Sequence, residues 1–157
     1  MLEAREITFE TLSRIMNLDV EKEQQDNVAP NSVTIAQNAY EPAGWVRGLW
    51  DGDSPIGLIA MLNPSVESPS FEAEDPTDAA FLWRLMIDKS QQGKGYGGMA
   101  MEIAFEQARL WGMPRFQTSC VPGEHSPQAF YEKCGLKATG RVIDGEVELI
   151  GPTPPKA

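Results

Sequence analysis

The sequence predicts an α/β fold in which a mixed sheet of about seven strands carries helices on both faces. The first observation is an apolar run, Ala79–Ile87, in which Arg84 is the one exception and which is typical of a strand that is buried on both sides. The second is a glycine-rich turn that follows this run and opens an amphipathic stretch, Met99–Trp111, so that strand, turn and helix come in that order. The third is a pair of hairpin patterns on either side of this unit, over residues 45–62 and 136–150.

The N-terminal elements are predicted to be one strand and two short helices. Arg5–Phe9 alternates weakly between apolar and polar residues and is expected to be the first strand. Thr11 can cap a helix over Leu12–Leu18, and Asn31–Ser32 can cap a second helix that runs through Tyr40. The stretch between these two helices is polar and mostly acidic.

The middle of the chain is predicted to be a hairpin and a long loop. Trp45–Trp50 and Ile56–Leu62 are its two strands, and Asp51–Pro55 has the composition of a turn. The loop Pro64–Asp78 contains three prolines and five acidic residues but no basic one. We expect it to be exposed, either as a solvated loop or as the acidic rim of a binding site.

The C-terminal half continues with a helix, a strand, a helix and a last hairpin. The first helix, Gly97–Trp111, places a row of alanines on one face, which suits close packing on a sheet. Phe116–Val121 is the next strand, and a short helix then starts at His125 or Ser126 and ends at Gly135. The hairpin turns at Asp144–Gly145. We expect residues 1–150 to form one domain and the proline-rich residues 151–157 to be a flexible tail.

Composition limits the function. The chain has 157 residues, a net charge of −10 and a pI near 4.5, which disfavours nucleic acid as a partner. An acidic field attracts small cations, although solubility alone would also explain the charge. No apolar stretch is long enough to span a membrane and no signal-peptide pattern is visible, so we expect a cytoplasmic protein with Cys120 and Cys134 reduced.

The glycine-rich turn, Gln92–Gly98, is predicted to bind an anion. Glycines let backbone N–H groups approach a phosphate closely, and the start of a helix adds roughly half a positive charge. The turn is not a Walker A loop, because no Lys-Ser/Thr pair opens the helix. It is also a poor dinucleotide fingerprint, because the chain after it is too short for a second nucleotide-binding half.

Gln92–Gly97 fits the pattern Q/R-x-x-G-x-G/A, and Ala129–Leu136 reads A-F-Y-E-K-C-G-L. In these two segments and in the order of its elements from Ile7 to Ile150, the sequence resembles the GNAT N-acetyltransferases. Trp83–Asp88, taken together with Gln92–Gly97, is most similar to the polyamine (spermine/spermidine) branch of that family. The resemblance implies the GNAT acyltransferase fold, acetyl-CoA as the co-substrate and no metal.

The resemblance also implies roles for individual residues. Tyr131 is the expected general acid for the departing thiolate, whereas without the resemblance a tyrosine in the core would be the simpler interpretation. Ser126 stands where the family usually has an asparagine that contacts the cofactor. The cofactor-binding residues implied by the resemblance are Leu85, Met86, Ile87, Gln92, Gly93, Lys94, Gly95, Tyr96, Gly97 and Ser126.

The expected reaction is direct acetyl transfer to a primary amine, with a polyamine or diamine as the best candidate. An aminoglycoside, an amino acid or a protein amine would also suit the acidic composition, and a non-catalytic acyl-CoA sensor is the rival class. A homodimer is a further expectation from the family. The residues expected to bind the substrate are Glu23, Asp26, Glu41 and Trp83, with a solvated helix face as the alternative for the acids. The general base is left open between His125, Glu41, Asp51 and relayed water.

Overall fold

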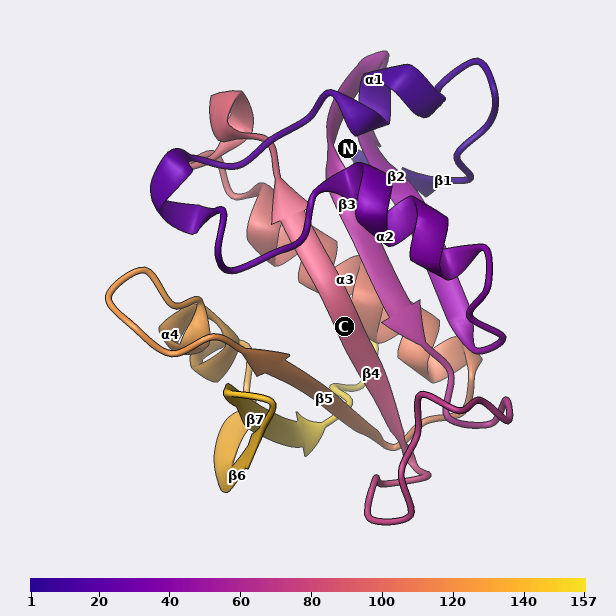
Figure 1. Ribbon diagram of the computed structural model, residues 1–157, viewed down its shortest axis with the longest axis vertical. Helices are drawn as coiled ribbons and strands as arrows, with labels where there is room; N and C mark the ends of the chain where they lie inside the picture. The colour runs from indigo at the N-terminus through magenta and orange to yellow at the C-terminus, as the bar shows by residue number, and fades with distance from the viewer.

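The computed structural model describes all 157 residues and shows one seven-stranded sheet with the order β1-β2-β3-β4-β5-β7-β6 (Figure 1). Helices cover both faces, so the predicted fold class is confirmed. The strands are β1 (Leu2–Arg5), β2 (Gly44–Asp51), β3 (Ser54–Leu62), β4 (Ala79–Ile87), β5 (Arg115–Cys120), β6 (Lys137–Ile143) and β7 (Glu146–Pro152). The helices are α1 (Leu12–Met16), α2 (Asn31–Asn38), α3 (Tyr96–Leu110) and α4 (Gln128–Lys133), with 3₁₀ turns η1 (Lys22–Gln24) and η2 (Lys89–Gln91).

The sheet consists of two antiparallel parts joined by one short parallel pair. Strands β1 to β4 pair in sequence order, and β5, β7 and β6 form the second part. Between the parts, β4 pairs with β5 only from Ala79–Leu82 to Arg115–Thr118. Beyond Leu82 the two strands separate, and Figure 1 shows β4 and β5 diverging from a shared end. A V-shaped opening therefore lies in the middle of the sheet.

Helix α3 covers one face of the sheet and encloses the larger part of the core. Ala100, Ala104 and Ala108 are fully buried on it at a spacing of four residues, which places them on one helix face. Phe105 of the same helix packs edge to face on Phe116 of β5, with ring centroids 4.8 Å apart. The predicted alanine face thus packs directly on the strands.

Helices α1 and α2 cover the other face with a smaller apolar cluster. Ile15 of α1 is fully buried there against residues of β2, β3 and β4. Asn31 begins α2 but does not cap it: Pro30 is the N-cap, and the buried Asn31 amide donates to the Ile15 carbonyl at 2.9 Å. The predicted capping role is therefore wrong, because this side chain joins the two helices instead.

Two further sequence predictions differ from the structure. The first strand lies at Leu2–Arg5 and not at Arg5–Phe9, because Leu2 is buried against the sheet whereas Phe9 is 92% exposed. The C-terminal tail is not free from Gly151 onward. Strand β7 continues through Pro152, and Thr153 N–H donates to the Pro114 carbonyl at 2.9 Å. No helix is long and apolar enough to cross a membrane.

Candidate active site

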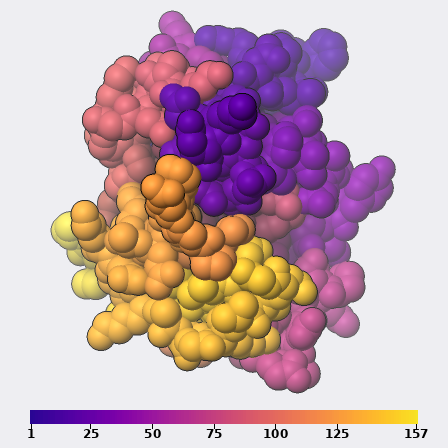
Figure 2. Space-filling view, turned by 60° about the vertical axis from the view of Figure 1, so that its left-hand side comes forward, coloured from indigo at the N-terminus to yellow at the C-terminus, as the bar shows by residue number.

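A cavity of about 1050 Å³ lies where β4 and β5 separate. Its walls come from the loop between α1 and α2, the 64–78 loop, the free part of β4, the β5–α4 loop and the β6–β7 hairpin. Figure 2 shows the orange β5–α4 loop meeting the indigo α1–α2 loop, with the yellow hairpin below them. There, the Asn27 amide donates to the His125 carbonyl at 2.7 Å, so the two loops are joined across the opening.

A β-bulge at Trp83 shapes the cavity side of β4. The register with β3 passes from Leu82 directly to Arg84, so Trp83 is the extra residue, one position after the last pair with β5. A bulge bends its strand and reverses which side chains face each side. Leu82 packs toward α3, and beyond the bulge Leu85 does so as well, whereas Met86 packs toward α1 and α2. The edge of 83–87 that β5 leaves faces the cavity.

The glycine loop opens one end of this cavity. Gly93 and Gly95 have φ angles of +77° and +84°, in the left-handed region that glycine adopts without strain. From Gly93 to Gly98 no backbone N–H donates to another group of the protein. These free donors surround the start of α3, which favours a bound anion. Lys94, which is exposed, directs its ammonium to Gln91 at 3.1 Å and does not line the cavity.

Two side chains expected to contact a cofactor are already bound within the protein. The Gln92 amide exchanges two hydrogen bonds with Gln24, at 2.8 and 3.2 Å, and also donates to the Ile87 carbonyl at 3.0 Å. Tyr96 donates its hydroxyl to Asp51 at 2.7 Å, and this bond raises the pKa of Tyr96. Because their side-chain polar groups are already hydrogen-bonded, Gln92 and Tyr96 present mainly backbone groups to a ligand in the cavity.

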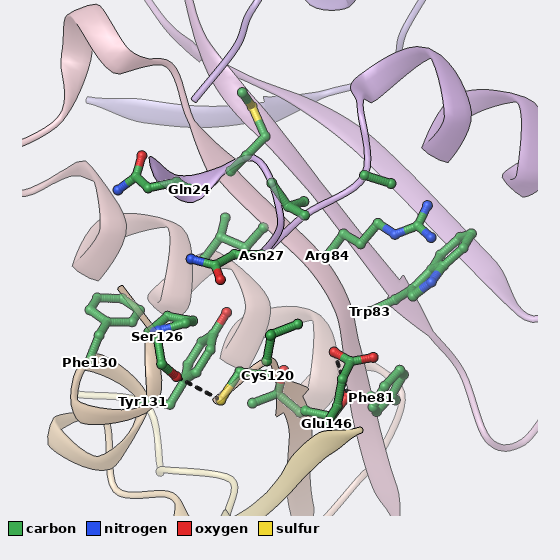
Figure 3. A pocket seen from close by; sticks show the side chains of 18 of the residues that line it. Gln24, Asn27, Phe81, Trp83, Arg84, Cys120, Ser126, Phe130, Tyr131 and Glu146 are labelled. Carbon is green, nitrogen blue, oxygen red and sulfur yellow. Dashed lines mark hydrogen bonds between the residues drawn. The ribbon is translucent and has the colours of Figure 1, made fainter. Parts of the chain in front are cut away.

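Tyr131 lies on α4 at the base of the opening, and Figure 3 shows its hydroxyl pointing into the cavity. Its side chain is buried, at 7% exposure, and this burial raises the pKa of Tyr131 well above the usual range. The phenol is consequently protonated at physiological pH. Ser126 also lines the cavity; its hydroxyl contacts the Cys120 sulfur at 3.7 Å and accepts from the Gln128 N–H at 3.3 Å.

Carboxylates outnumber cations on the cavity wall. Only two guanidinium groups line it, from Arg84 and Arg141. Arg84 stacks on Trp83, 4.6 Å from the ring centroid, and donates to Thr34 and Gln37 of α2. The acidic residues that line the cavity are Asp26, Glu41, Glu72, Asp75, Asp144, Glu146 and Glu148. Glu23, expected to bind the substrate, is exposed on η1 and lies outside the cavity.

Glu41 is held firmly by its neighbours. Its carboxylate accepts from the hydroxyls of Ser68 and Ser70 and from the Ala43 N–H. Partial burial opposes its ionisation, but these hydrogen bonds outweigh that effect and lower the pKa of Glu41. Asp51, another open candidate for the base, binds Tyr96 and the N-terminal ammonium and does not line the cavity.

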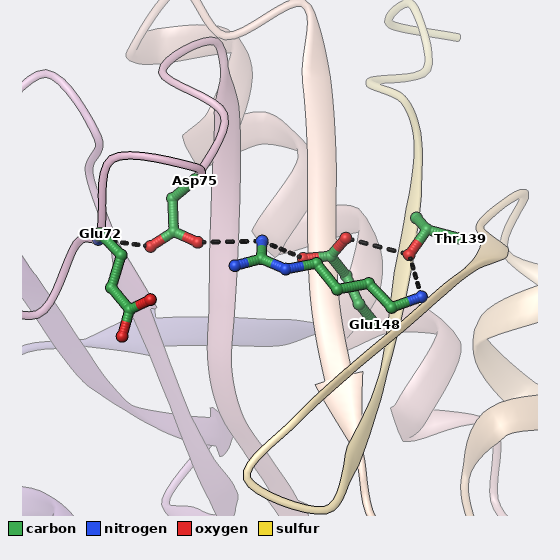
Figure 4. Close-up of polar contacts among 5 residues, drawn as sticks. Glu72, Asp75, Thr139 and Glu148 are labelled. Atoms are coloured by element: carbon green, nitrogen blue, oxygen red, sulfur yellow. Dashed lines mark hydrogen bonds and ion pairs between the residues drawn. The ribbon is translucent and has the colours of Figure 1, made fainter.

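An ion-pair network joins the 64–78 loop to the last hairpin. Arg141 of β6 lies between Asp75 at 3.2 Å and Glu148 of β7 at 3.3 Å, and Glu148 also accepts from Thr139 at 3.0 Å (Figure 4). The Glu72 N–H donates to Asp75 at 2.8 Å. This hairpin was not predicted from the sequence as a cavity wall, although Glu146 and Glu148 stand two apart, the spacing that places both on one face of a strand.

The histidine and the two cysteines of the chain form no cluster at the cavity. His125 is exposed and contacts the α1–α2 loop through its carbonyl. Cys120 is buried and Cys134 half-buried, and both are free thiols. No group of three or more histidine, cysteine, aspartate or glutamate side chains is arranged to hold a metal ion.

The sequence and the fold were compared with those of known proteins. The model of the acetyltransferase (GNAT) family matches residues 7–136. Among curated proteins, none matches the chain by sequence. An aminoglycoside acetyltransferase, AAC(6')-Ib, solved with coenzyme A, has a TM-score of 0.76 at 17% identity and covers 97% of this chain and 95% of its own. An acetyltransferase from Thermus thermophilus has a TM-score of 0.71 at 19% identity, covering 97% of each chain. The PaiA N-acetyltransferase from Thermoplasma acidophilum, with coenzyme A, has a TM-score of 0.66 at 14% identity, covering 97% and 99%.

Proposed function

The chain belongs to the acetyltransferase (GNAT) family, with acetyl-CoA as its co-substrate, and from this premise we propose that it acetylates a primary amine of a small polycation, a polyamine or diamine first of all. The observation that carries the proposal is the charge of the cavity wall. Seven carboxylates face the cavity against two guanidinium groups, and one of those, Arg141, is already paired with two of the carboxylates. A cationic acceptor would compensate the excess negative charge.

The residues present fit acetyl-CoA. The free N–H groups of Gly93–Gly98 and the start of α3 would hold its pyrophosphate, and the edge of β4 at Leu85–Ile87 would pair with its pantetheine arm as an added strand does. Acetyl-CoA supplies the acetyl group as a thioester. The Tyr131 hydroxyl, kept neutral by burial, would donate its proton to the departing sulfur.

The acceptor would enter from the acidic side of the cavity. Glu41 and Asp75 lie on that side together with the last hairpin, and Asp26 is at its exposed rim. A second ammonium several bonds from the reacting nitrogen would find carboxylates to bind, whereas an uncharged tail would leave them uncompensated. Aminoglycosides are polycations too, and the similar AAC(6')-Ib structures include one with kanamycin, so they are the second candidate.

The test is release of free thiol from acetyl-CoA in the presence of single amines. The panel holds spermine, spermidine, putrescine, kanamycin and a peptide with a free N-terminus, and butylamine serves as the matched control for putrescine because it lacks only the second amine. We expect turnover with the polyamines and a much lower kcat/KM for butylamine. Equal kcat/KM values for butylamine and putrescine would contradict the role given to the acidic wall.

The rival class is a sensor that binds acyl-CoA without turning it over. Calorimetric titration with coenzyme A separates the two classes, because both bind but only the enzyme releases thiol. Binding without release for every amine would contradict the catalytic proposal. Turnover with kanamycin and none with the polyamines would keep the reaction and replace the acceptor.

A further inference from the structure

The cavity contains one half-buried carboxylate that has neither an ion pair nor a short hydrogen bond within the protein. Among the acidic residues of the wall, Glu41 is held by two serines, whereas Asp75 and Glu148 share Arg141. Asp26, Glu72 and Asp144 are exposed to solvent. Glu146 is the exception, because it is half-buried with no ion pair and without the short hydrogen bonds that hold Glu41; its one hydrogen-bond partner is the Ser119 hydroxyl, at 3.5 Å.

Glu146 also lies near the place where β4 and β5 separate. It is the first residue of β7, and its neighbour Val147 pairs with Cys120 of β5. Ser119, which it contacts, comes directly after the last residue that β5 pairs with β4. Figure 3 shows the Glu146 carboxylate in the cavity beside Phe81, with Cys120 and Tyr131 farther along the opening. Through Ser119 the carboxylate therefore lies in the cavity close to the place where β5 leaves β4.

We propose that Glu146 is the catalytic proton acceptor for the amine, an inference that rests on the proposed function. The carboxylate takes one proton from the acceptor ammonium, which leaves the nitrogen lone pair free. A C–N bond then forms at the thioester carbonyl carbon while the C–S bond breaks. The nitrogen loses its second proton as the sulfur gains one from Tyr131, and that second proton restores the phenol. The proton held by Glu146 passes to solvent, so one proton is released for each amide formed.

Charges around Glu146 support this direction of proton transfer. Burial lowers the pKa of Arg84, and the charge of Glu146 opposes that shift, so the two side chains act on each other across the cavity. A guanidinium beside an incoming ammonium lowers the pKa of that ammonium. The titratable groups near Glu146 in the cavity are Arg84 of β4, Cys120 of β5 and, on its own hairpin, Asp144 and Glu148.

The test is the pH profile of kcat/KM for Glu146→Gln, measured with the best amine of the panel. General-base groups contribute roughly 10²–10⁴-fold, so we expect a loss of that size near neutral pH. Without its acceptor, the variant depends on amine that is already neutral. Its kcat/KM should therefore rise close to tenfold per pH unit toward the pKa of the amine, and the deficit relative to wild type should shrink accordingly.

Glu67→Gln is the matched control, because it removes the same charge from an exposed residue outside the cavity. We expect it to keep the wild-type profile, and we expect all three proteins to bind coenzyme A with equal affinity. A Glu146→Gln variant with the wild-type kcat/KM, or with a deficit that stays constant from pH 6 to 10, would overturn the assignment while the wild-type activity stands. A wild-type protein without turnover on any amine would overturn the proposed function, and the role of Glu146 with it.

Discussion

Replacing Gly95 with alanine tests whether the glycine loop needs the left-handed backbone that the structure shows. The residue has a φ of +84° as the N-cap of α3, and a Cβ placed on it would meet nothing within 4 Å. Steric contact with the protein therefore contributes nothing, and the cost is conformational alone. A residue other than glycine in this region loses about 1–2 kcal/mol, because its Cβ crowds the following carbonyl oxygen.

This cost divides between two measurable quantities. If Gly95→Ala keeps the loop as it is, the strain lowers the free energy of unfolding, and each kcal/mol lowers Tm by about 2–4 °C in a chain of this size. If the loop relaxes instead, the N–H groups no longer converge, and coenzyme A binds about 5–30-fold more weakly, since each 1.4 kcal/mol is a factor of ten. Thermal unfolding and calorimetric titration should together account for about 1–2 kcal/mol.

Gly98→Ala is the control for unfolding. This glycine lies inside α3 without a positive φ, and its added Cβ also meets nothing within 4 Å. Alanine is the better helix former, so we expect this variant to gain about 0.5–1 kcal/mol in stability. If Gly95→Ala retained both the wild-type Tm and the wild-type affinity for coenzyme A, the argument from the left-handed backbone would be refuted.

Two further predictions concern the cavity wall. Tyr131→Phe should lower kcat by roughly 10²-fold or more and leave the affinity for coenzyme A unchanged, because only the donated proton is lost; an unchanged kcat would remove the phenol from the proposed reaction. Glu41→Gln should change the acid dependence of stability. The folded protein lowers the pKa of Glu41 below the ordinary value of 4.5, so ionised Glu41 stabilises the fold above that pH, and this contribution is lost as pH falls through the lowered pKa. Thermal unfolding should show the variant less stable than wild type near pH 7, with a difference that shrinks as pH falls below 4.5, and a difference that stayed constant in acid would contradict the assignment.

The central strand and the loop after it could be read from the sequence because local chemistry determines them. The run Ala79–Ile87 has the same bounds in the structure, because its apolar residues, interrupted only by Arg84, stand out from the polar residues on either side. The predicted position of the first strand is wrong for the opposite reason. Its pattern is weak, and its position depends on pairing Leu2 with Asp51, nearly fifty residues away. The prediction that the flexible tail begins at Gly151 is wrong for the same reason, because Gly151 pairs with the distant Phe116 of β5.

The backbone features of the candidate site could be predicted from the sequence, whereas the hydrogen bonds of its side chains could not. The glycine spacing indicated an anion-binding turn, and the structure has free N–H groups there. A motif cannot show that the Gln92 amide and the Tyr96 hydroxyl already have partners within the protein. The sequence does not predict that the hairpin carboxylates Glu146 and Glu148 line the cavity, because this depends on where the last hairpin lies relative to β4, which no local pattern reveals.

The alanine face of α3 connects the packed interior of the protein with the glycine loop at the start of the helix. The helix extends about 22 Å from its N-terminal turn at Tyr96, and Ala104 and Ala108 set its distance from the strands. A larger residue at Ala108 would displace the whole helix, and the displacement would reach the turn at Gly95 that is proposed to bind phosphate. Loss of affinity for coenzyme A is therefore not by itself a sign that a mutated residue contacts the cofactor. In a random mutant library, interior alanine substitutions and loop substitutions would produce the same phenotype, and only their different thermal stabilities would distinguish them.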